Sequence, residues 1–124
     1  MTVRLLNAAV MPRPGRYELW RLTPAKFASL VAQHRPISYI GYPACAELLS
    51  DLCHCEILLN RESTPMEDGD SMLIARLKYR VRNPAAKGQV RATVDDYEFF
   101  EGVFSTHAGN YTRARVSGRL SGAE

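Results

Sequence analysis

Four cations recur at every second position of one stretch of this sequence: Arg76, Lys78, Arg80 and Arg82. Alternate residues of a β-strand point to the same face, so a strand here would carry its cations in one row. Exposed neighbouring like charges repel by about 1 kcal/mol or less per pair, and a bound anion relieves that repulsion. Charged strand faces also protect sheets from aggregation. The stripe therefore predicts either an anion-binding surface that includes Arg76, Lys78 and Arg80, or a solvated face.

A second candidate site is the junction within the stretch SYIGYPACAELLSDL, residues 38–52. A short apolar run stops at Gly41, and Pro43 has the position that proline favours at the start of a helix. A strand, a glycine and a helix N-terminus together are a common way to hold an anion. Tyr42 lies in the middle of this junction, which raises the question of whether it does chemistry there.

The consecutive residues Cys53, His54 and Cys55 suggest a metal site, but their spacing does not favour one. Zinc usually takes four ligands, and adjacent residues of a strand point to opposite faces. With Cys45 the cysteines are odd in number, which is poor material for a disulfide framework. We expect no metal and no cofactor, and we interpret the cysteines as small, half-buried residues at a helix-to-strand junction.

The composition favours one folded domain. The chain has 124 residues, 46% of them hydrophobic and 23% charged, which is ordinary for a globular protein. A net charge of +3 permits an anionic ligand without requiring one. No apolar run approaches the roughly 20 residues of a membrane span, and no signal peptide is convincing. We expect a cytoplasmic protein with no membrane partner.

The hydrophobic pattern mixes strands and helices, so we expect an α/β (α+β) fold. Residues 1–106 should form a single domain, with a mixed central sheet of about five strands flanked by helices. Residues 107–124 form a Gly/Ser/Arg-rich tail. The expected strands are 2–10, 16–22, 37–40, 55–60, 71–82 and 95–104. Helices are expected from Pro24 to about His34, behind a Thr23 cap, and from Pro43 onward.

Four ordered stretches carry a resemblance to a known family: LLNAAVMP, IGYPACAELLSDL, LLNR and DGDSMLIARLKYR. Together they resemble the small viral anti-CRISPR ring nucleases that act against type III CRISPR systems. The resemblance covers about residues 3 to 104. It implies a symmetric homodimer whose interface holds a cyclic tetra-adenylate, with no long nucleic acid as partner. It also implies metal-free cleavage, in which a ribose 2′-hydroxyl attacks the adjacent phosphate and a histidine protonates the leaving oxygen.

The resemblance also assigns roles to matching positions. Asn7 falls on the ligand-contacting asparagine, and Arg61 and Arg80 fall on arginines that face phosphates. Two positions depart from the family pattern. Tyr42 stands where the family has its catalytic histidine, and Asn83 stands where some members carry a helpful glutamate. Tyrosine has a reference pKa of about 10, so it is a poor base at neutral pH but can donate a proton.

Three functions follow from this pattern. The first is a viral or mobile-element counter-defence protein that binds a cyclic nucleotide second messenger and sequesters it or cleaves it slowly. Its ligand-binding set is Asn7, Gly41, Tyr42, Arg61, Arg76, Lys78, Arg80 and Asn83. The second is an active metal-independent ring nuclease in which Tyr42 is the acid. The third is a structural or regulatory homodimer that has lost the ligand, with Tyr42 as a packed aromatic residue.

Overall fold

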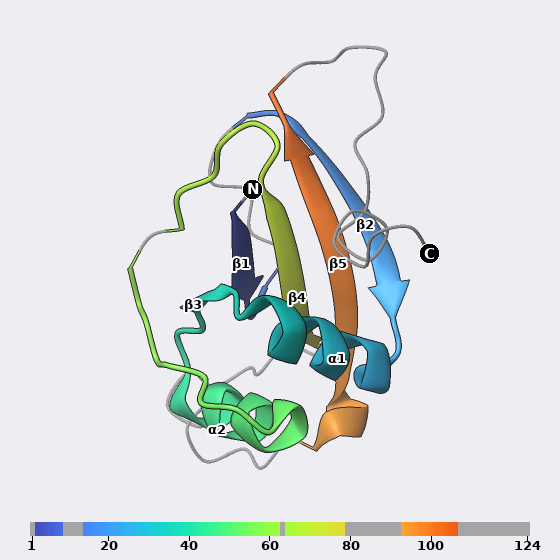
Figure 1. The fold of residues 1–124 in the computed structure, drawn as a ribbon, viewed down its shortest axis with the longest axis vertical. Coiled ribbons are helices and arrows are strands. Elements are labelled where there is room, and N and C mark those ends of the chain that lie inside the picture. Colours follow the sequence, from blue (N-terminus) through green and yellow to red (C-terminus); the bar gives the residue numbers. More distant parts are fainter. Residues whose placement is uncertain (1, 9–13, 63, 79–92, 107–124) are drawn as a thin grey trace.

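The computed structural model describes residues 2–8, 14–62, 64–78 and 93–106. They form a single α+β domain with a five-stranded mixed sheet and two α-helices (Figure 1). The strands are β1 (Val3–Leu6), β2 (Arg16–Leu22), β3 (Ile37–Tyr39), β4 (Ser71–Leu77) and β5 (Tyr97–Ser105). The helices are α1 (Pro24–His34), α2 (Pro43–Cys53) and the short 3-10 helix η2 (Val94–Asp96). The expected fold class is confirmed.

The strand order places three parallel carboxyl ends side by side. The sheet has the order β2-β5-β4-β1-β3. Strand β1 pairs in parallel with both β3 and β4, whereas β5 is antiparallel to both β4 and β2. Four strands therefore run one way, and β5 alone opposes them. The ends of β1, β3 and β4 meet at one edge, toward α2 in Figure 1. In open α/β sheets this carboxyl edge is where ligands bind.

Both helices begin where their sequence signals predict, and α1 also ends at the predicted His34. The Thr23 side chain accepts a hydrogen bond of 3.1 Å from a backbone N–H of the first turn of α1. Pro43 opens α2, because its fixed φ suits a first helical turn and its missing N–H is not needed there. The helices end at Arg35 and His54, which both take left-handed backbone conformations. The predicted starts at Pro24 and Pro43 are confirmed.

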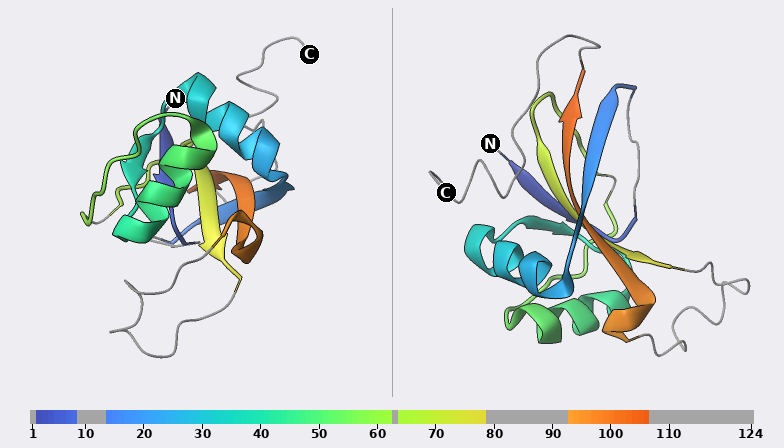
Figure 2. Two further views of the ribbon diagram at one scale, coloured as in Figure 1. Left: turned by 90° about the horizontal axis from the view of Figure 1, so that it is seen from below. Right: turned by 90° about the vertical axis from the view of Figure 1, so that its right-hand side faces the viewer.

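The main hydrophobic core lies between the helices and one face of the sheet, as the side view in Figure 2 shows. Phe27 of α1 packs against Phe99 of β5, with ring centroids 4.7 Å apart. Leu49 of α2 and Leu5 of β1 are also fully buried in this cluster. Burying such side chains stabilises the fold by about 1.5–3 kcal/mol each. This core fixes α2, and with it the junction at Tyr42, against the sheet.

The other face of the sheet carries a smaller apolar cluster and no helix of the described residues. Alternation along β4 explains the division, because Leu73 and Ala75 face the helices while Met72 and Ile74 face away. The predicted two-faced strand is therefore confirmed over its described length. Met66, from the loop before β4, is buried in the second cluster. We call this second side the uncovered face.

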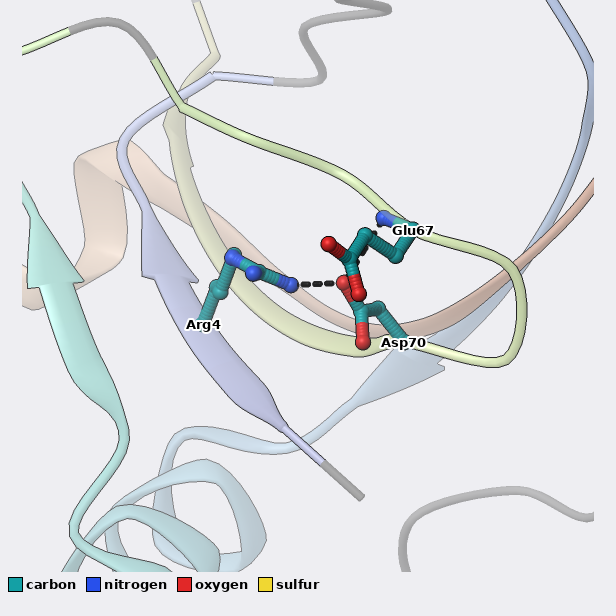
Figure 3. Close-up of polar contacts among 3 residues, drawn as sticks. All are labelled: Arg4, Glu67 and Asp70. Atoms are coloured by element: carbon teal, nitrogen blue, oxygen red, sulfur yellow. Dashed lines mark hydrogen bonds and ion pairs between the residues drawn. The ribbon is translucent and has the colours of Figure 1, made fainter.

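A buried ion pair fastens that loop to the sheet (Figure 3). Arg4 of β1 donates to Asp70, and both side chains are buried. The same Asp70 carboxylate oxygen accepts a hydrogen bond of 2.8 Å from the backbone N–H of Glu67. Because β1 and β4 pair at their starts, Val3 with Ser71, this contact lies at the end of the sheet opposite the carboxyl edge. It holds Met66 over the uncovered face.

The prediction of a strand at 55–60 is wrong. This segment makes one isolated bridge, Ile40 with Leu59, rather than a ladder. Its other hydrogen bonds to β3 involve side chains. For example, the Ser38 hydroxyl donates to the carbonyl of Leu58 at 2.6 Å. Strand β3 is only three residues long and offers little backbone for pairing. Leu58 is 62% exposed, so the apolar pattern here does not reflect burial.

Three other strand predictions had the right place and the wrong length. The strand predicted for residues 2–10 ends at Leu6. Within the described residues, the strand predicted for residues 71–82 ends at Leu77. The predicted start of the last strand is taken by η2, whose Thr93 and Asp96 cap it reciprocally. Residues 79–92 and the tail 107–124 lie outside the described residues.

Candidate functional site

The centre of the candidate site is a contact between Arg61 and Gly41. The Arg61 side chain donates from Nε to the carbonyl oxygen of Gly41 at 3.0 Å. Gly41 directly precedes Tyr42, the residue that introduces α2. The contact therefore holds an exposed guanidinium beside the start of this helix, with its terminal NH2 groups unpaired within the described part of the chain. The sequence predicted both residues for the ligand set, and the structure brings them together.

Asn60 and Ser38 position Arg61, and sequence reasoning did not select either of them. The Asn60 side chain donates to the carbonyl of Ser38 at 3.0 Å, and its backbone N–H donates to the carbonyl of Ile40 at 2.8 Å. Its side-chain oxygen accepts from the N–H of Glu62 at 3.0 Å. These bonds tie the residues on both sides of Arg61 to the end of β3. A polar residue directly after the apolar run ILL was the signal available in the sequence.

Tyr42 lies at the N-cap position of α2 in an extended conformation, and 45% of it is exposed. Its side chain makes no cap hydrogen bond, and the first turn of α2 has no acidic residue. The N–H groups of a first helical turn carry a partial positive charge and have no partner inside the helix. A negatively charged group is therefore favoured near this end of α2, beside Arg61.

Asn7 and the cations of β4 approach the same edge from the next strands. Asn7 directly follows β1, and Lys78 directly follows β4, which is parallel to β1. The backbone N–H of Lys78 donates to the carbonyl of Asp96 at 2.9 Å, which fixes the end of β4 against η2. The Lys78 ammonium has no partner among the described residues. Two of the predicted ligand residues therefore lie at the carboxyl edge, Asn7 after β1, which is the neighbour of β3, and Lys78 after β4, which lies on the other side of β1.

Arg76 differs from the prediction that it forms part of an open row of cations. Its Nη2 lies 3.3 Å from Oε1 of Glu98, and its guanidinium carbon lies 5.1 Å from the centre of the Phe100 ring. Glu98 also pairs with Arg21, at 2.9 Å. Arg76 is thus on the uncovered face and is already neutralised in part. The sequence could not show this, because Glu98 comes from a different strand.

The remaining predicted ligand residues, Arg80 and Asn83, lie outside the described residues. The part of the stripe beyond Lys78 therefore stays a prediction. The same is true of the tail from residue 107.

Two of the three cysteines lie where burial makes them poor nucleophiles. Cys45 and Cys53 are buried free thiols. Burial, with a smaller contribution from Cys55, raises the pKa of Cys53 to about 12. Burial also raises the pKa of Cys45, against a smaller lowering by a hydrogen bond with Tyr97. Within the described ranges, no group of three His, Cys, Asp or Glu side chains is arranged to hold a metal ion.

Neither α1 nor α2, the two α-helices of the described residues, has the length and apolarity that a membrane span requires.

Comparison with known proteins places the chain in a family. The model of the STIV B116-like family matches residues 3–99, which include β1 to β4 and the first three residues of β5. The chain belongs to the STIV B116-like family. The match also includes the junction at Gly41 and Arg61, so the candidate site lies inside the part that defines this family.

Two relatives of this STIV B116-like chain are viral proteins. Uncharacterized protein 26 of Sulfolobus islandicus filamentous virus (isolate Iceland/Hveragerdi) is 33% identical over 98 residues, covering 76% of this chain and 80% of the relative. The solved structure of B116 of Sulfolobus turreted icosahedral virus has the same fold, with a TM-score of 0.64 at 21% identity. That likeness covers 83% of this chain and 99% of B116. Both relatives are viral proteins, and a viral origin fits this chain.

Proposed function

We propose that this STIV B116-like protein binds a cyclic nucleotide immune second messenger and sequesters it or cleaves it slowly, as a viral counter-defence protein. The observation that carries the proposal is the contact of Arg61 with Gly41, which places an exposed guanidinium beside the start of α2. Arginine suits a phosphate because its planar fork can donate two parallel hydrogen bonds. The first turn of α2 offers a second attraction for the same charge.

The shape of the carboxyl edge supports a ligand with several phosphates. Asn7, Arg61 and Lys78 come from segments that follow three different structural elements, and all lie toward the same edge. A cyclic oligonucleotide carries its phosphates around a ring, so it can meet cations that are spread along an edge. The resemblance to anti-CRISPR ring nucleases favours a cyclic oligoadenylate, and Arg80 and Asn83 remain ligand residues in this proposal.

The proposal includes a homodimer with the ligand at its interface, in the cytoplasm of the host cell. One chain presents its cations on one side of a ring-shaped ligand only. A symmetric dimer presents the same residues twice, which matches the repeated phosphates of a cyclic oligonucleotide. The proposal therefore predicts one ligand for two chains.

Isothermal titration calorimetry with cyclic di-, tri- and tetranucleotides tests this function. We expect saturable binding of at least one cyclic oligoadenylate, at one ligand per two chains. Separation of the products by chromatography shows whether the ligand stays intact. Absence of binding to every member of the panel at high micromolar concentration would leave the ligand-free structural or regulatory homodimer as the function.

An active ring nuclease is the second candidate, because Tyr42 is 45% exposed at the helix start beside the Arg61 contact. In this reaction a ribose 2′-hydroxyl attacks the adjacent phosphorus, and the bond from phosphorus to the 5′-oxygen breaks. The attacking 2′-hydroxyl would lose its proton to water and the Tyr42 hydroxyl would give its proton to that leaving oxygen, which yields a 2′,3′-cyclic phosphate and a 5′-hydroxyl, and Tyr42 would then regain a proton from water. General acid catalysis contributes about 10²–10⁴-fold in rate. Tyr42→Phe should therefore abolish most turnover, and equal turnover would exclude this role.

A further inference from the structure

The uncovered face of the sheet carries a carboxylate between two guanidiniums. Glu98 of β5 lies between Arg21 of β2 and Arg76 of β4, since β5 is flanked by these strands. One carboxylate oxygen is 2.9 Å from Nη2 of Arg21, and the other is 3.3 Å from Nη2 of Arg76. Two arginines thus converge on one acidic group, an arrangement that can equally receive a phosphate.

We call Arg21, Glu98 and Arg76 the triad. Its exposure to water decides whether another anion can replace the Glu98 carboxylate. The Glu98 side chain is 20% exposed, whereas the side chains of Arg21 and Arg76 are 63% and 44% exposed. Ion pairs this accessible to water contribute little to stability, so opening them is easy. The triad also keeps one excess positive charge after Glu98 is counted. A phosphate dianion would neutralise both arginines, which the single charge of Glu98 does not.

We propose that Glu98 acts as an internal competitor for Arg21 and Arg76, and that it limits how tightly phosphate groups bind at this end of the sheet. This inference rests on the proposed function and on the ligand set predicted from the sequence, which includes Arg76. Glu98 sets the affinity of that set without contacting the ligand, because it keeps Arg76 turned toward β5. A ligand must displace Glu98 before its phosphate reaches either arginine.

Inorganic pyrophosphate is a suitable first probe because it needs no nucleotide pocket. Binding is followed by nuclear magnetic resonance of the arginine Nε–Hε groups in the wild type and in Glu98→Gln. Glutamine keeps the size of the side chain and removes its charge. Glu18→Gln is the matched control, because Glu18 pairs with Arg16 at 2.6 Å elsewhere on the same sheet. Urea unfolding first establishes that both variants fold.

We expect Glu98→Gln to bind pyrophosphate about tenfold more tightly than the wild type and Glu18→Gln, with shifts at Arg21 and Arg76. Adding Arg76→Gln to Glu98→Gln should remove the gain. Glu98→Asp, which keeps the charge on a shorter side chain, should give an intermediate affinity and serves if the glutamine variant fails to fold. An unchanged affinity, or an equal gain in Glu18→Gln, would overturn the proposal.

The same variants are then titrated with cyclic tetra-adenylate. Tighter binding by Glu98→Gln would support the link between the triad and the proposed ligand. A wild type that binds no cyclic nucleotide, beside a pyrophosphate gain in Glu98→Gln, would reject the proposed function and keep the role of Glu98. If the wild type binds the cyclic nucleotide and Glu98→Gln changes neither the nucleotide affinity nor the pyrophosphate affinity, the proposed function is kept and the role of Glu98 is rejected.

Discussion

Arg61 and Gly41 are joined by one hydrogen bond of 3.0 Å, from the arginine Nε to the glycine carbonyl oxygen. Twenty residues separate them in the chain, and the whole of α2 lies between them. The bond closes this loop at the start of the helix and sets the direction of the guanidinium. Its terminal nitrogens are the part of Arg61 that we expect a phosphate to contact.

Arg61→Ala should weaken binding of cyclic tetra-adenylate by about 10–100-fold. A hydrogen bond to a charged group is worth about 1.5–3 kcal/mol, and this range converts to that change in affinity. The free energy of unfolding should change little, because the side chain is exposed. Calorimetry and urea unfolding measure the two quantities. Arg16→Ala, at the opposite end of the sheet, should leave the affinity within about twofold, and an equal loss there would indicate a general charge effect.

Asn60→Ala should lower both the stability and the affinity. It removes one donor to Ser38 and one acceptor for the N–H of Glu62, and each unsatisfied group costs about 1–3 kcal/mol where water is excluded. The partly exposed position puts the expected loss near the lower end of that range. Asn60→Asp keeps the acceptor and loses the donor, so it should lie between the alanine variant and the wild type. If Asn60→Ala binds as tightly as the wild type, the positioning role is wrong.

Asp70→Ala should lower the free energy of unfolding by about 3–5 kcal/mol. The change leaves the buried Arg4 guanidinium without its partner, and a buried charge without a partner is strongly destabilising. Replacing both partners, Arg4→Met with Asp70→Leu, should cost less than either single change. Urea unfolding measures all three variants. Asp51→Asn, an exposed position on α2, is the control and should change the stability by less than about 0.5 kcal/mol.

Stability should fall in alkaline solution, partly through Cys53. Folding raises the pKa of this thiol from 9.0 to about 12, so the folded chain keeps a proton that the unfolded chain loses. The stabilising contribution is complete below pH 9 and disappears as the pH rises toward 12. Urea midpoints across this range should fall less steeply in Cys53→Ala than in the wild type. Parallel pH profiles for the two proteins would contradict the assignment.

Much of the fold could be predicted because its signals are local. Thr23 and Pro24 define the start of α1, Pro43 defines the start of α2, and alternation along β4 divides its residues between two faces. The segment 55–60 misled the prediction, because its apolar residues suggest a strand while Ser38 and Asn60 make most of its contacts through side chains. A sequence pattern cannot show which edge has enough backbone to accept another strand.

The site was predicted less completely, for a reason that concerns distance along the chain. Gly41 and Arg61 were both selected, but their contact depends on how α2 folds back. Arg76 was selected as a free cation, while Glu98, 22 residues later, takes part of its charge. Asn60 was not selected, because two of its three bonds go to residues near Ser38 that only the fold brings near. Partners from other strands decide which cations are available.

The most direct test of cyclic nucleotide binding is a calorimetric titration of the wild-type protein with cyclic tetra-adenylate, followed by chromatography of the ligand. We expect saturable binding at one ligand per two chains, with most of the ligand intact after the titration and an affinity that falls in Arg61→Ala. No heat of binding up to high micromolar concentration, for this ligand and for the cyclic di- and trinucleotides, would contradict the proposed function.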